Sequence, residues 1–140
     1  MKVQDLMSKR LFALPETATA EAAARLMAKE NIGLLPVLQK GRLTGVVTDR
    51  DLATRCLGAG LDPTRTPLKK IMTKKVYAAR PEETIMEASR TMAQHRIRRL
   101  PVCREDSVVG ILSVSDLARR ADTGFEAAMA IAEISMPEEK

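Results

Sequence analysis

The sequence predicts an α+β fold made of two copies of one β-α-β-β-α unit, followed by a C-terminal helix. Three pairs of segments keep the same offset of 65 residues (110 minus 45, for example): 45–52 and 110–117, 35–37 and 100–102, 5–8 and 70–73. A fixed period with matching residue types at turns and at element starts indicates two copies of one supersecondary unit. Two such copies usually pack across a pseudo-two-fold axis.

The first copy is expected over residues 1–60. Its short strand, helix, two strands and closing helix are expected, in that order, at residues 10–14, 19–30, 35–39, 42–47 and 49–57. In the first helix, Ala23, Leu26 and Met27 have the spacing of a single apolar face. A Lys-Gly pair separates the two strand-like runs and favours a hairpin. A Gly-Ala-Gly stretch ends the closing helix.

The second copy is expected over residues 68–121, after a linker at 61–67 that belongs to an exposed loop starting at residue 58. Its first helix begins with a capping box, in which the Thr84 hydroxyl and the Glu87 carboxylate can satisfy free N–H groups of the first turn. The buried stripe of this helix is expected to consist of Ile85, Ala88, Met92 and Ala93. Two strands and a closing helix come next, at residues 100–103, 108–112 and 114–120.

The last part of the chain, residues 122–140, is expected to form a C-terminal helix and tail without a counterpart in the first copy. A helical segment at residues 123–136 places Phe125, Met129 and either Ile131 or Ala132 on one side. This pattern favours a helix that docks on the body of the protein or on a second subunit.

Cysteine content and the lack of a signal peptide or a membrane-spanning apolar run indicate a soluble, cytoplasmic protein. A copy of about 60 residues is at the lower edge of independent stability, so the pair is expected to fold as a unit. The two cysteines lack CxxC spacing and indicate neither a disulfide framework nor a zinc site. The first residues lack the apolar stretch of a signal peptide, and no apolar run reaches the length that spans a bilayer, so no membrane contact is expected.

The charge of the chain favours acidic ligands. The net charge is +5 and the sequence pI is about 9.5, which suits nucleotide phosphates among other anions. The chain has no Trp, one Tyr and two Phe, which argues against the aromatic stacking platforms of single-stranded nucleic-acid binders. Nucleic-acid binding through the basic surface is therefore ranked last among the candidate functions.

The sharpest candidates for a binding site are two matching pairs, Thr48 with Asp51 and Ser113 with Asp116. Each pair places a hydroxyl at the end of a strand and a carboxylate three residues later, in the first turn of a helix. A single pair of this kind is explained by helix capping. Here it occurs twice, each time after Gly-apolar-apolar and together with an apolar-Pro-Val strand start, and this combination goes beyond capping.

Together these motifs resemble the cystathionine β-synthase (CBS) domain, in the tandem arrangement called a Bateman module. The resemblance covers residues 1–121, and the chain looks closest to small bacterial proteins that are little more than two such domains. The resemblance implies two β-α-β-β-α units whose sheets pack against each other, and two clefts that can bind adenosine-containing ligands. Candidate regulatory ligands are AMP, ADP, ATP, NAD and S-adenosylmethionine; no resident cofactor is expected.

The resemblance also implies roles for residues. Asp51 and Asp116 would hold ribose hydroxyls, and Thr48 and Ser113 would contact ribose or phosphate; a carboxylate can accept two hydrogen bonds from adjacent sugar hydroxyls. Adenine would lie among apolar residues, of which Leu11, Phe12, Ala13, Leu34, Leu35 and Pro36 would line one cleft and Val76, Tyr77, Ala78, Leu100 and Pro101 the other.

Arg96, Arg98 and Arg99 are the phosphate candidates, because guanidinium groups suit phosphate geometry. The alternative is a solvated basic strand edge next to a helix C-terminus. The first copy has Gly33 and Leu34 at the positions that match Arg98 and Arg99, so at most one cleft is expected to bind a phosphorylated ligand tightly.

Catalysis is not expected, since His95 is the only histidine and neither a catalytic triad nor a His-rich metal site can be assembled. The leading hypothesis is a non-catalytic homodimeric sensor that signals to an unknown partner polypeptide. The alternative is a ligand-free structural or interaction dimer. Self-association is expected through the helices that carry Ala22, Leu26, Arg90 and Met92, and through those that carry Leu52 and Leu117.

Overall fold

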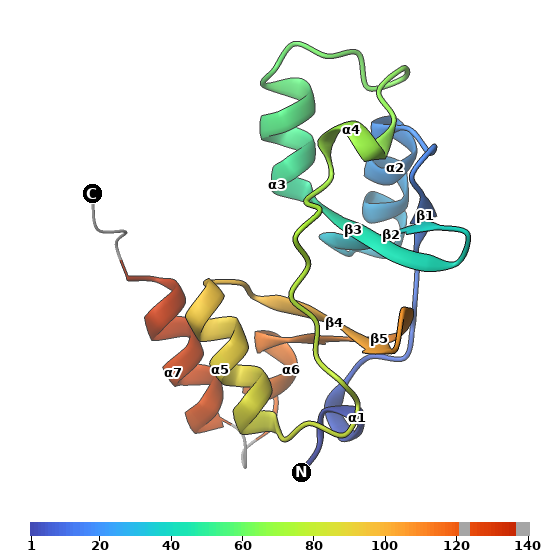
Figure 1. Ribbon diagram of the computed structural model, residues 1–140. Coiled ribbons are helices and arrows are strands. Elements are labelled where there is room, and N and C mark those ends of the chain that lie inside the picture. Colours follow the sequence, from blue (N-terminus) through green and yellow to red (C-terminus); the bar gives the residue numbers. More distant parts are fainter. Residues whose placement is uncertain (121–123, 137–140) are drawn as a thin grey trace. The chain divides into compact units, whose positions relative to one another are not determined.

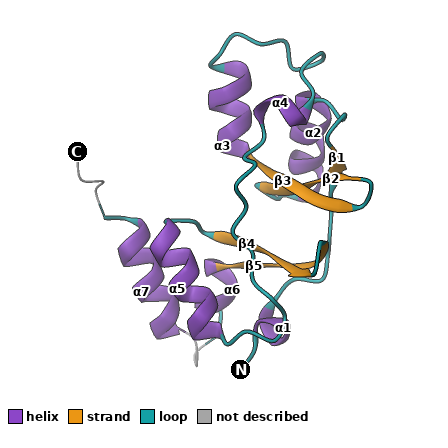
Figure 2. Ribbon diagram, viewed as in Figure 1, coloured by secondary structure: helices purple, strands orange, loops and turns teal. Residues whose placement is uncertain are grey.

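The computed structural model describes residues 1–120 and 124–136, and it confirms a mixed α/β fold that contains the β-α-β-β-α unit twice (Figures 1 and 2). Residues 121–123, which include the predicted end of the second copy, and residues 137–140 of the expected tail lie outside the described residues. The chain divides into two compact units. One unit, called here the central unit, is Phe12–Val76; the other, called the terminal unit, joins Met1–Leu11 to the chain from Tyr77 onward.

The central unit is built on a three-stranded sheet of order β1-β2-β3 (Figure 2). Its elements are β1 (Leu14–Pro15), α2 (Ala20–Glu30), β2 (Leu34–Gln39), β3 (Arg42–Thr48), α3 (Asp49–Asp51), the π-helix η1 (Leu52–Leu57) and α4 (Leu68–Ile71). Strand β1 is parallel to β2, and β2 is antiparallel to β3. The two hairpin strands and helix α2 lie where the sequence predicts them.

Two details of the central unit differ from the prediction. The expected strand at residues 10–14 is reduced to Leu14 and Pro15, which pair with Val37 and Leu38. The expected helix at residues 49–57 is helical, but its second part winds as a π-helix, with the Gly58 N–H bonded to the Ala53 carbonyl five residues earlier at 2.7 Å. Such windings are frequent at functional sites.

The terminal unit contains the second sheet, β4-β5 (Figure 2). Its elements are α1 (Val3–Leu6), α5 (Ile85–His95), β4 (Arg99–Arg104), β5 (Ser107–Ser113), α6 (Val114–Ala118) and α7 (Gly124–Ile134). Ala79 pairs in parallel with Val102, as Leu14 pairs with Val37 in the central unit. Helix α6 ends at Ala118, two residues before the expected end.

Helices α2 and α5, which occupy equivalent places in the two repeats, begin with matching caps. The Thr19 hydroxyl accepts from the N–H of Ala22, and the Thr84 hydroxyl accepts from the N–H of Glu87, as the sequence predicts for the second helix. Both helices end at a residue in the left-handed region, Asn31 and Arg96, at φ of 55° and 54°. Arg96, a phosphate candidate, therefore has a defined structural position as a helix C-cap.

Each unit has its own apolar core. The terminal core includes Val3, Leu100, Leu112 and Leu117 together with the predicted helix stripe, of which Ile85, Ala88 and Met92 are buried and Ala93 is partly buried. The central core gathers residues such as Ala23, Met27 and Leu35. Met92 and Leu117 are fully buried in the terminal core, so self-association of the helices that carry them, which stays a prediction, would use their other side chains.

The segment that begins each repeat, called here its leading segment, pairs with a strand of the other repeat. Ser8 pairs with Ile111 on β5, and Thr73 pairs with Val46 on β3; both pairs are joined by two backbone hydrogen bonds of 2.8–3.0 Å. The two bridges are related by the 65-residue offset of the sequence (73 minus 8). The segment before Thr73 is held in the same way, since Leu68 N–H bonds the Ala18 carbonyl at 2.8 Å.

This pairing also explains a difference from the predicted loop at residues 58–67. Most of that loop is exposed as expected, but Thr66 is only 5% exposed. Its carbonyl accepts a hydrogen bond from Ala20 N–H at 2.9 Å, and its hydroxyl donates to the Asp62 carbonyl at 2.7 Å. The end of the loop is therefore part of the central unit.

Two glycines of the repeat allow these segments to approach the sheets. A Cβ atom on Gly45 would lie 2.7 Å from Sδ of Met72, and one on Gly110 would lie 2.6 Å from Sδ of Met7 and 3.0 Å from the Ser8 carbonyl oxygen. Real Cβ contacts are longer than this. The glycines at these two positions and the methionines that cross them therefore form a packing pair in each unit.

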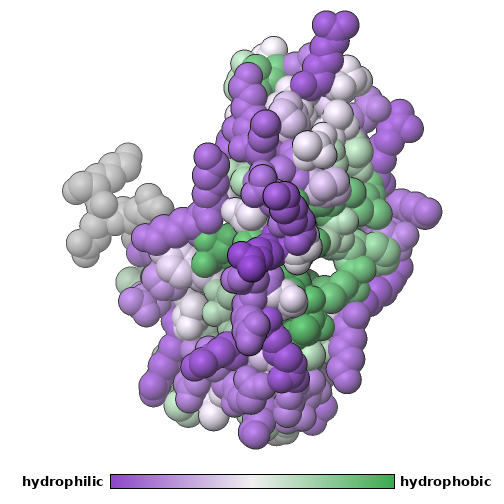
Figure 3. Space-filling view, turned by 45° about the vertical axis from the view of Figure 1, so that its right-hand side comes forward, coloured by the Kyte–Doolittle hydropathy of each residue, from purple (hydrophilic) through white to green (hydrophobic). Residues whose placement is uncertain are grey.

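The C-terminal helix α7 packs on α5 and α6 of the terminal unit, which confirms that it docks on the body of the protein (Figure 1). Its buried residues are Ala127 and Ala130, whereas Phe125, Met129 and Ile131 are exposed. The face predicted to be apolar and docked is thus largely open to solvent. Hydrophilic side chains predominate on the face drawn in Figure 3, in keeping with a charged fraction of 29%.

We expect Gly110→Ala to destabilise the protein by about 1–3 kcal/mol, because the added methyl overpacks the contact with Met7 and the Ser8 carbonyl. Urea unfolding followed by circular dichroism measures this. Gly124→Ala is the matched control, since a Cβ there meets nothing within 4 Å. Equal stability of Gly110→Ala and the parent chain would contradict the role of the glycine.

Candidate functional site

Both predicted hydroxyl–carboxylate pairs form complete capping boxes. The Thr48 hydroxyl accepts from Asp51 N–H at 3.1 Å, and the Asp51 carboxylate accepts from Thr48 N–H at 3.0 Å. In the second repeat, Ser113 and Asp116 make the same two bonds at 3.1 and 2.8 Å. One carboxylate oxygen of each aspartate is therefore used by the backbone of its own turn.

The second oxygen of Asp51 faces an arginine that is itself held in place. Arg55 Nε lies 3.7 Å from Asp51 Oδ1, and Thr73 donates to Asp51 Oδ2 at 3.5 Å. The Nη1 atom of Arg55 also donates to the carbonyls of Ile71 and Met72 and to the Thr73 hydroxyl, at 3.2–3.3 Å. Arg55 thus ties the carboxylate to the segment that crosses β3, and Asp51 is only 8% exposed.

The second oxygen of Asp116 has a looser partner. Arg119 donates to Asp116 Oδ1, and its side chain is 71% exposed against 11% for the aspartate. An exposed ion pair of this kind contributes about 0–1 kcal/mol, so the arginine can leave at little cost. The equivalent carboxylates of the two repeats therefore differ in how firmly the neighbouring arginine is held: Arg55 is fixed beside Asp51, whereas Arg119 is exposed beside Asp116.

Sequence reasoning did not identify Arg55 and Thr73 as neighbours of Asp51. The spacing of Asp51 and Arg55 is that of an i,i+4 helix pair, which is a signal available in the sequence. The contact with Thr73 depends on the pairing of residues 73 and 46 across the sheet, for which the sequence offers only the repeat of Met72-Thr73 and Met7-Ser8.

A small pocket in the terminal unit brings together Arg98, Arg99 and Ser113, three of the predicted ligand-binding residues. Its volume is about 170 Å³, and Val114, Ser115, Ile131 and Ile134 complete its lining. The carbonyl of Arg98 accepts from Val114 N–H at 2.9 Å, which joins the start of β4 to the start of α6. Ile131 and Ile134 come from α7, and nothing in the repeat pattern predicts their presence there.

This pocket is smaller than the 300–1,000 Å³ typical of sites that enclose a whole ligand. It has room for the anionic end of a molecule, and its lining includes two arginines and a serine, residue types that can donate hydrogen bonds to an anion. Arg96 does not line it, because it is the C-cap of α5. The first repeat has Gly33 and Leu34 in place of the two arginines.

The predicted adenine-pocket residues are divided between the two units. In the central unit, Phe12 is partly buried, Ala13 is exposed, and Leu34, Leu35 and Pro36 lie on β2, where Leu35 and Pro36 are buried. In the terminal unit, Leu100 and Pro101 are buried on β4, and the Tyr77 ring stacks on His95 with centroids 3.5 Å apart. Leu11, Val76 and Ala78 lie at or near the points where the chain passes from one unit to the other. Their contact with adenine stays a prediction.

The other reactive groups offer little for catalysis. Both cysteines are free and buried. Burial, with the charge of Asp106 adding to it, raises the pKa of the Cys103 thiol and disfavours the reactive thiolate. Within residues 1–120 and 124–136, no group of three His, Cys, Asp or Glu side chains could hold a metal ion. In the same residues, no helix has both the length and the apolar character required to cross a membrane.

The fold and the paired capping boxes define a class of tandem-repeat module, and comparison with known proteins identifies it. A family model for the CBS domain matches residues 3–58 and 68–122. The chain belongs to the CBS domain family and contains a pair of these domains.

Two of the relatives match this chain over most of their own length. The chain is 36% identical over 133 residues to the CBS domain-containing protein YhcV of Bacillus subtilis, covering 95% of this chain and 94% of that protein. It is 35% identical over 117 residues to hypoxic response protein 1 of Mycobacterium tuberculosis, covering 83% and 82%. The crystal structure of the CBS domain pair of protein MJ0100, in complex with 5′-methylthioadenosine and S-adenosyl-L-methionine, matches with a TM-score of 0.77 and 28% identity, covering 85% of this chain and 94% of that one.

We expect the two arginines beside the aspartates to differ in their effect on stability. Arg55→Ala removes three hydrogen bonds and an ion pair, and it should lower the free energy of unfolding by about 1–2 kcal/mol. Arg119→Ala removes one exposed ion pair and should cost less than about 0.5 kcal/mol. Urea unfolding of both variants checks this, and equal losses would show that Arg55 is not a structural tie.

Proposed function

We propose that this CBS domain pair is a non-catalytic regulatory module that binds an adenosine-containing ligand and passes its occupancy on to another polypeptide. The observation that carries the proposal is the pocket that joins Arg98, Arg99 and Ser113 beside the capping box of Asp116. It assembles phosphate-compatible donors next to a carboxylate that can accept ribose hydroxyls. The adenosyl ligands of the MJ0100 domain pair support the ligand class.

The second repeat is proposed as the working site. Asp116 Oδ1 accepts from the exposed Arg119, which a ribose can replace at small cost. Asp51 faces Arg55, which three further hydrogen bonds keep in place. The cationic pair is also confined to the second repeat. The adenine is proposed to contact Val76, Tyr77, Ala78, Leu100 and Pro101.

A phosphorylated ligand such as AMP, ADP, ATP or NAD is favoured over S-adenosylmethionine. Arg98 and Arg99 are among the residues that line a pocket large enough for a phosphate but too small for a whole nucleotide. Methylthioadenosine and S-adenosylmethionine carry no phosphate, so they would leave this pocket without its best-matched group. Arg96, at the C-cap of α5, is proposed to act only at longer range.

The proposal also includes a homodimer in the cytoplasm. The outer face of α2 has an exposed Ala22 and a partly exposed Leu26, so it is available for self-association. Two free, buried cysteines suit a reducing compartment. Sedimentation velocity of the purified chain, with an Ala22→Glu variant as the disrupting change, tests the assembly.

A second candidate is a ligand-free structural or interaction protein of the same fold. It is favoured by one observation: capping alone accounts for the conformations of Thr48, Asp51, Ser113 and Asp116. The two candidates differ in whether the charge of Asp116 is needed to bind a ligand or whether the side chain serves only as a helix cap. Asn at this position keeps a side-chain oxygen for the Ser113 N–H but loses the carboxylate, so it separates a cap from a ligand contact.

We expect thermal unfolding against a panel of AMP, ADP, ATP, NAD and S-adenosylmethionine to show stabilisation by one or more phosphorylated ligands. A ligand at 100 times its Kd adds about 2.7 kcal/mol to the stability of the native state. Asp116→Asn and Arg98→Ala should abolish the shift without loss of intrinsic stability.

Asp51→Asn and Arg80→Ala are the matched controls, one in the equivalent capping box and one on an exposed arginine outside the pocket. If no adenine ligand shifts the unfolding of a folded chain, the ligand-free candidate is correct. A shift abolished by Asp51→Asn but not by Asp116→Asn would move the working site to the first repeat.

A further inference from the structure

The small pocket of the terminal unit is built from two parts of the chain. The second repeat supplies four residues of types that can donate hydrogen bonds to an anion: Arg98, Arg99, Ser113 and Ser115. Helix α7, which lies outside the repeat, supplies Ile131 and Ile134. An isoleucine side chain has no hydrogen-bonding group, so α7 contributes bulk to the lining without contributing a donor.

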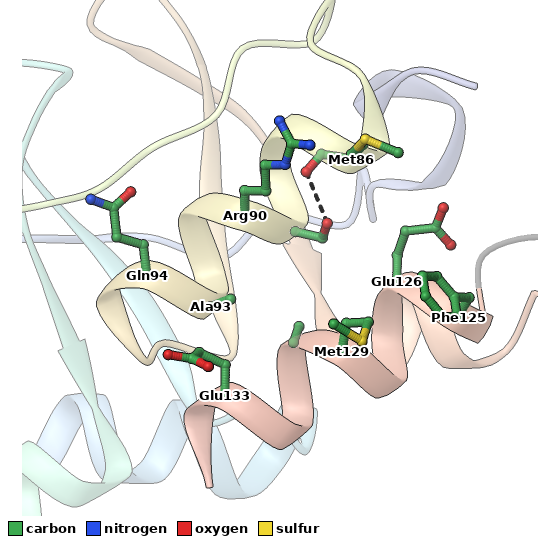
Figure 4. Close-up of a pocket in the computed structure, with 10 residues that line it drawn as sticks. Met86, Arg90, Ala93, Gln94, Phe125, Glu126, Met129 and Glu133 are labelled. Atoms are coloured by element: carbon green, nitrogen blue, oxygen red, sulfur yellow. Dashed lines mark hydrogen bonds between the residues drawn. The ribbon is translucent and has the colours of Figure 1, made fainter. Parts of the chain in front are cut away.

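Core contacts hold these isoleucines at the pocket. Four residues of α7 have the i, i+3, i+4, i+7 spacing of one helix face: Ala127, Ala130, Ile131 and Ile134. Both alanines are buried, and Ile134 packs against the terminal core, so this face is turned toward the body of the unit. Met129 lies elsewhere on the helix, where it borders a groove between α5 and α7 (Figure 4). The isoleucines therefore form a fixed wall of the pocket.

The charge of the lining matches one phosphate group. Arg98 and Arg99 carry one positive charge each, and a phosphate monoester carries a charge of about −1.5 to −2 at pH 7. A second or third phosphate adds negative charge that this pair leaves unbalanced. Where a longer phosphate chain meets the isoleucines, its oxygens lose water and gain no donor, which is costly. The lining thus favours a ligand that ends in a single phosphate.

We propose that Ile131 and Ile134 are specificity-determining residues that restrict this pocket to one phosphate group, so that the chain prefers adenosine monophosphate to the di- and triphosphate. This inference rests on the proposed function and narrows its ligand class. The repeat supplies the groups that bind the phosphate, and α7 sets how far a phosphate chain can extend. A pocket of about 170 Å³, below the size that encloses a whole ligand, agrees with this division.

The test is to measure the Kd of AMP, ADP and ATP for the full chain by isothermal titration calorimetry, in magnesium-free buffer so that the phosphates keep their full charge. We expect AMP to bind about tenfold more tightly than ATP or better, with ADP in between. Ile131→Lys places a cation in the apolar wall, and it should reduce the ratio of the two Kd values to about threefold or less by strengthening ATP binding. Ile131→Ala removes bulk without adding charge and should reduce the ratio by a smaller factor.

Met129→Lys is the matched control, because it adds the same charge to an exposed position of α7 away from the pocket and should leave the ratio unchanged. Ile131 is 46% exposed, so its variants are expected to fold, which circular dichroism checks. The inference fails if AMP and ATP bind the parent chain equally well, or if neither Ile131 variant changes the ratio. It also fails if Met129→Lys changes the ratio as much as Ile131→Lys does, since the effect is then one of overall charge.

These outcomes are distinct from failure of the proposed function. If the nucleotides bind without discrimination by phosphate number and Arg98→Ala abolishes the binding, the adenosine site stands and the restriction by α7 is rejected. A preference for ATP over AMP in the parent chain likewise rejects the restriction alone. If none of the three nucleotides binds to the folded parent chain, the proposed function and the restriction are both rejected.

Discussion

The exchange of leading segments between the two repeats is the constraint on which the rest of the structure depends. Backbone N–H and C=O groups buried at a sheet edge must find partners. In each unit, the outer edge of the hairpin finds them in the segment that begins the other repeat: Ser8 for β5 and Thr73 for β3. The glycines of the repeat, Gly45 and Gly110, are there to let that segment approach. Core formation in each unit depends on the same exchange, since Val3 and Leu68 are fully buried by it.

The same exchange sets the state of the two candidate ligand contacts. In the central unit, Thr73 and the carbonyls of Ile71 and Met72 hold Arg55 against Asp51. In the terminal unit, Asp116 is paired with Arg119 at the end of its own short helix, and α7 packs nearby. Two nearly identical sequence motifs thus acquire different surroundings, because the crossing segment holds the arginine beside Asp51, whereas the arginine beside Asp116 is exposed. A site that looks duplicated in the sequence is asymmetric in the fold.

Most of the secondary structure could be predicted, since each local signal agrees with the tertiary context. The helices α2 and α5 combine a threonine cap with an apolar stripe, and the hairpins combine strand runs with turn residues. The failures have specific causes. Residues 10–13 are strand-like in composition, but the strand that pairs with β2 begins only at Leu14. The buried face of α7 is made of alanines, which carry a weaker apolar signal than Phe125 and Met129.

The candidate site was predictable in part. The capping boxes and the two arginines could be located from the repeat, because their positions are fixed by local turns and strand starts. Arg55, Ile131 and Ile134 were missed, because their places depend on which segments meet across a sheet or on a helix outside the repeat. Periodicity in a single sequence shows which residues share a face, but not which other face they meet.

The exchange of segments also has a consequence for synthesis on the ribosome. The central unit, Phe12–Val76, is a continuous stretch and can close as soon as it has emerged. Met1–Leu11, although made before the central unit, belongs to the terminal unit, and Ser8 meets Ile111 only after 103 further residues have been added (111 minus 8). Contacts between residues so distant in sequence form late, because closing a long loop costs entropy. The sheet partner of Ser8 therefore does not exist until the second hairpin has been made, whereas every residue of the central unit is available by then.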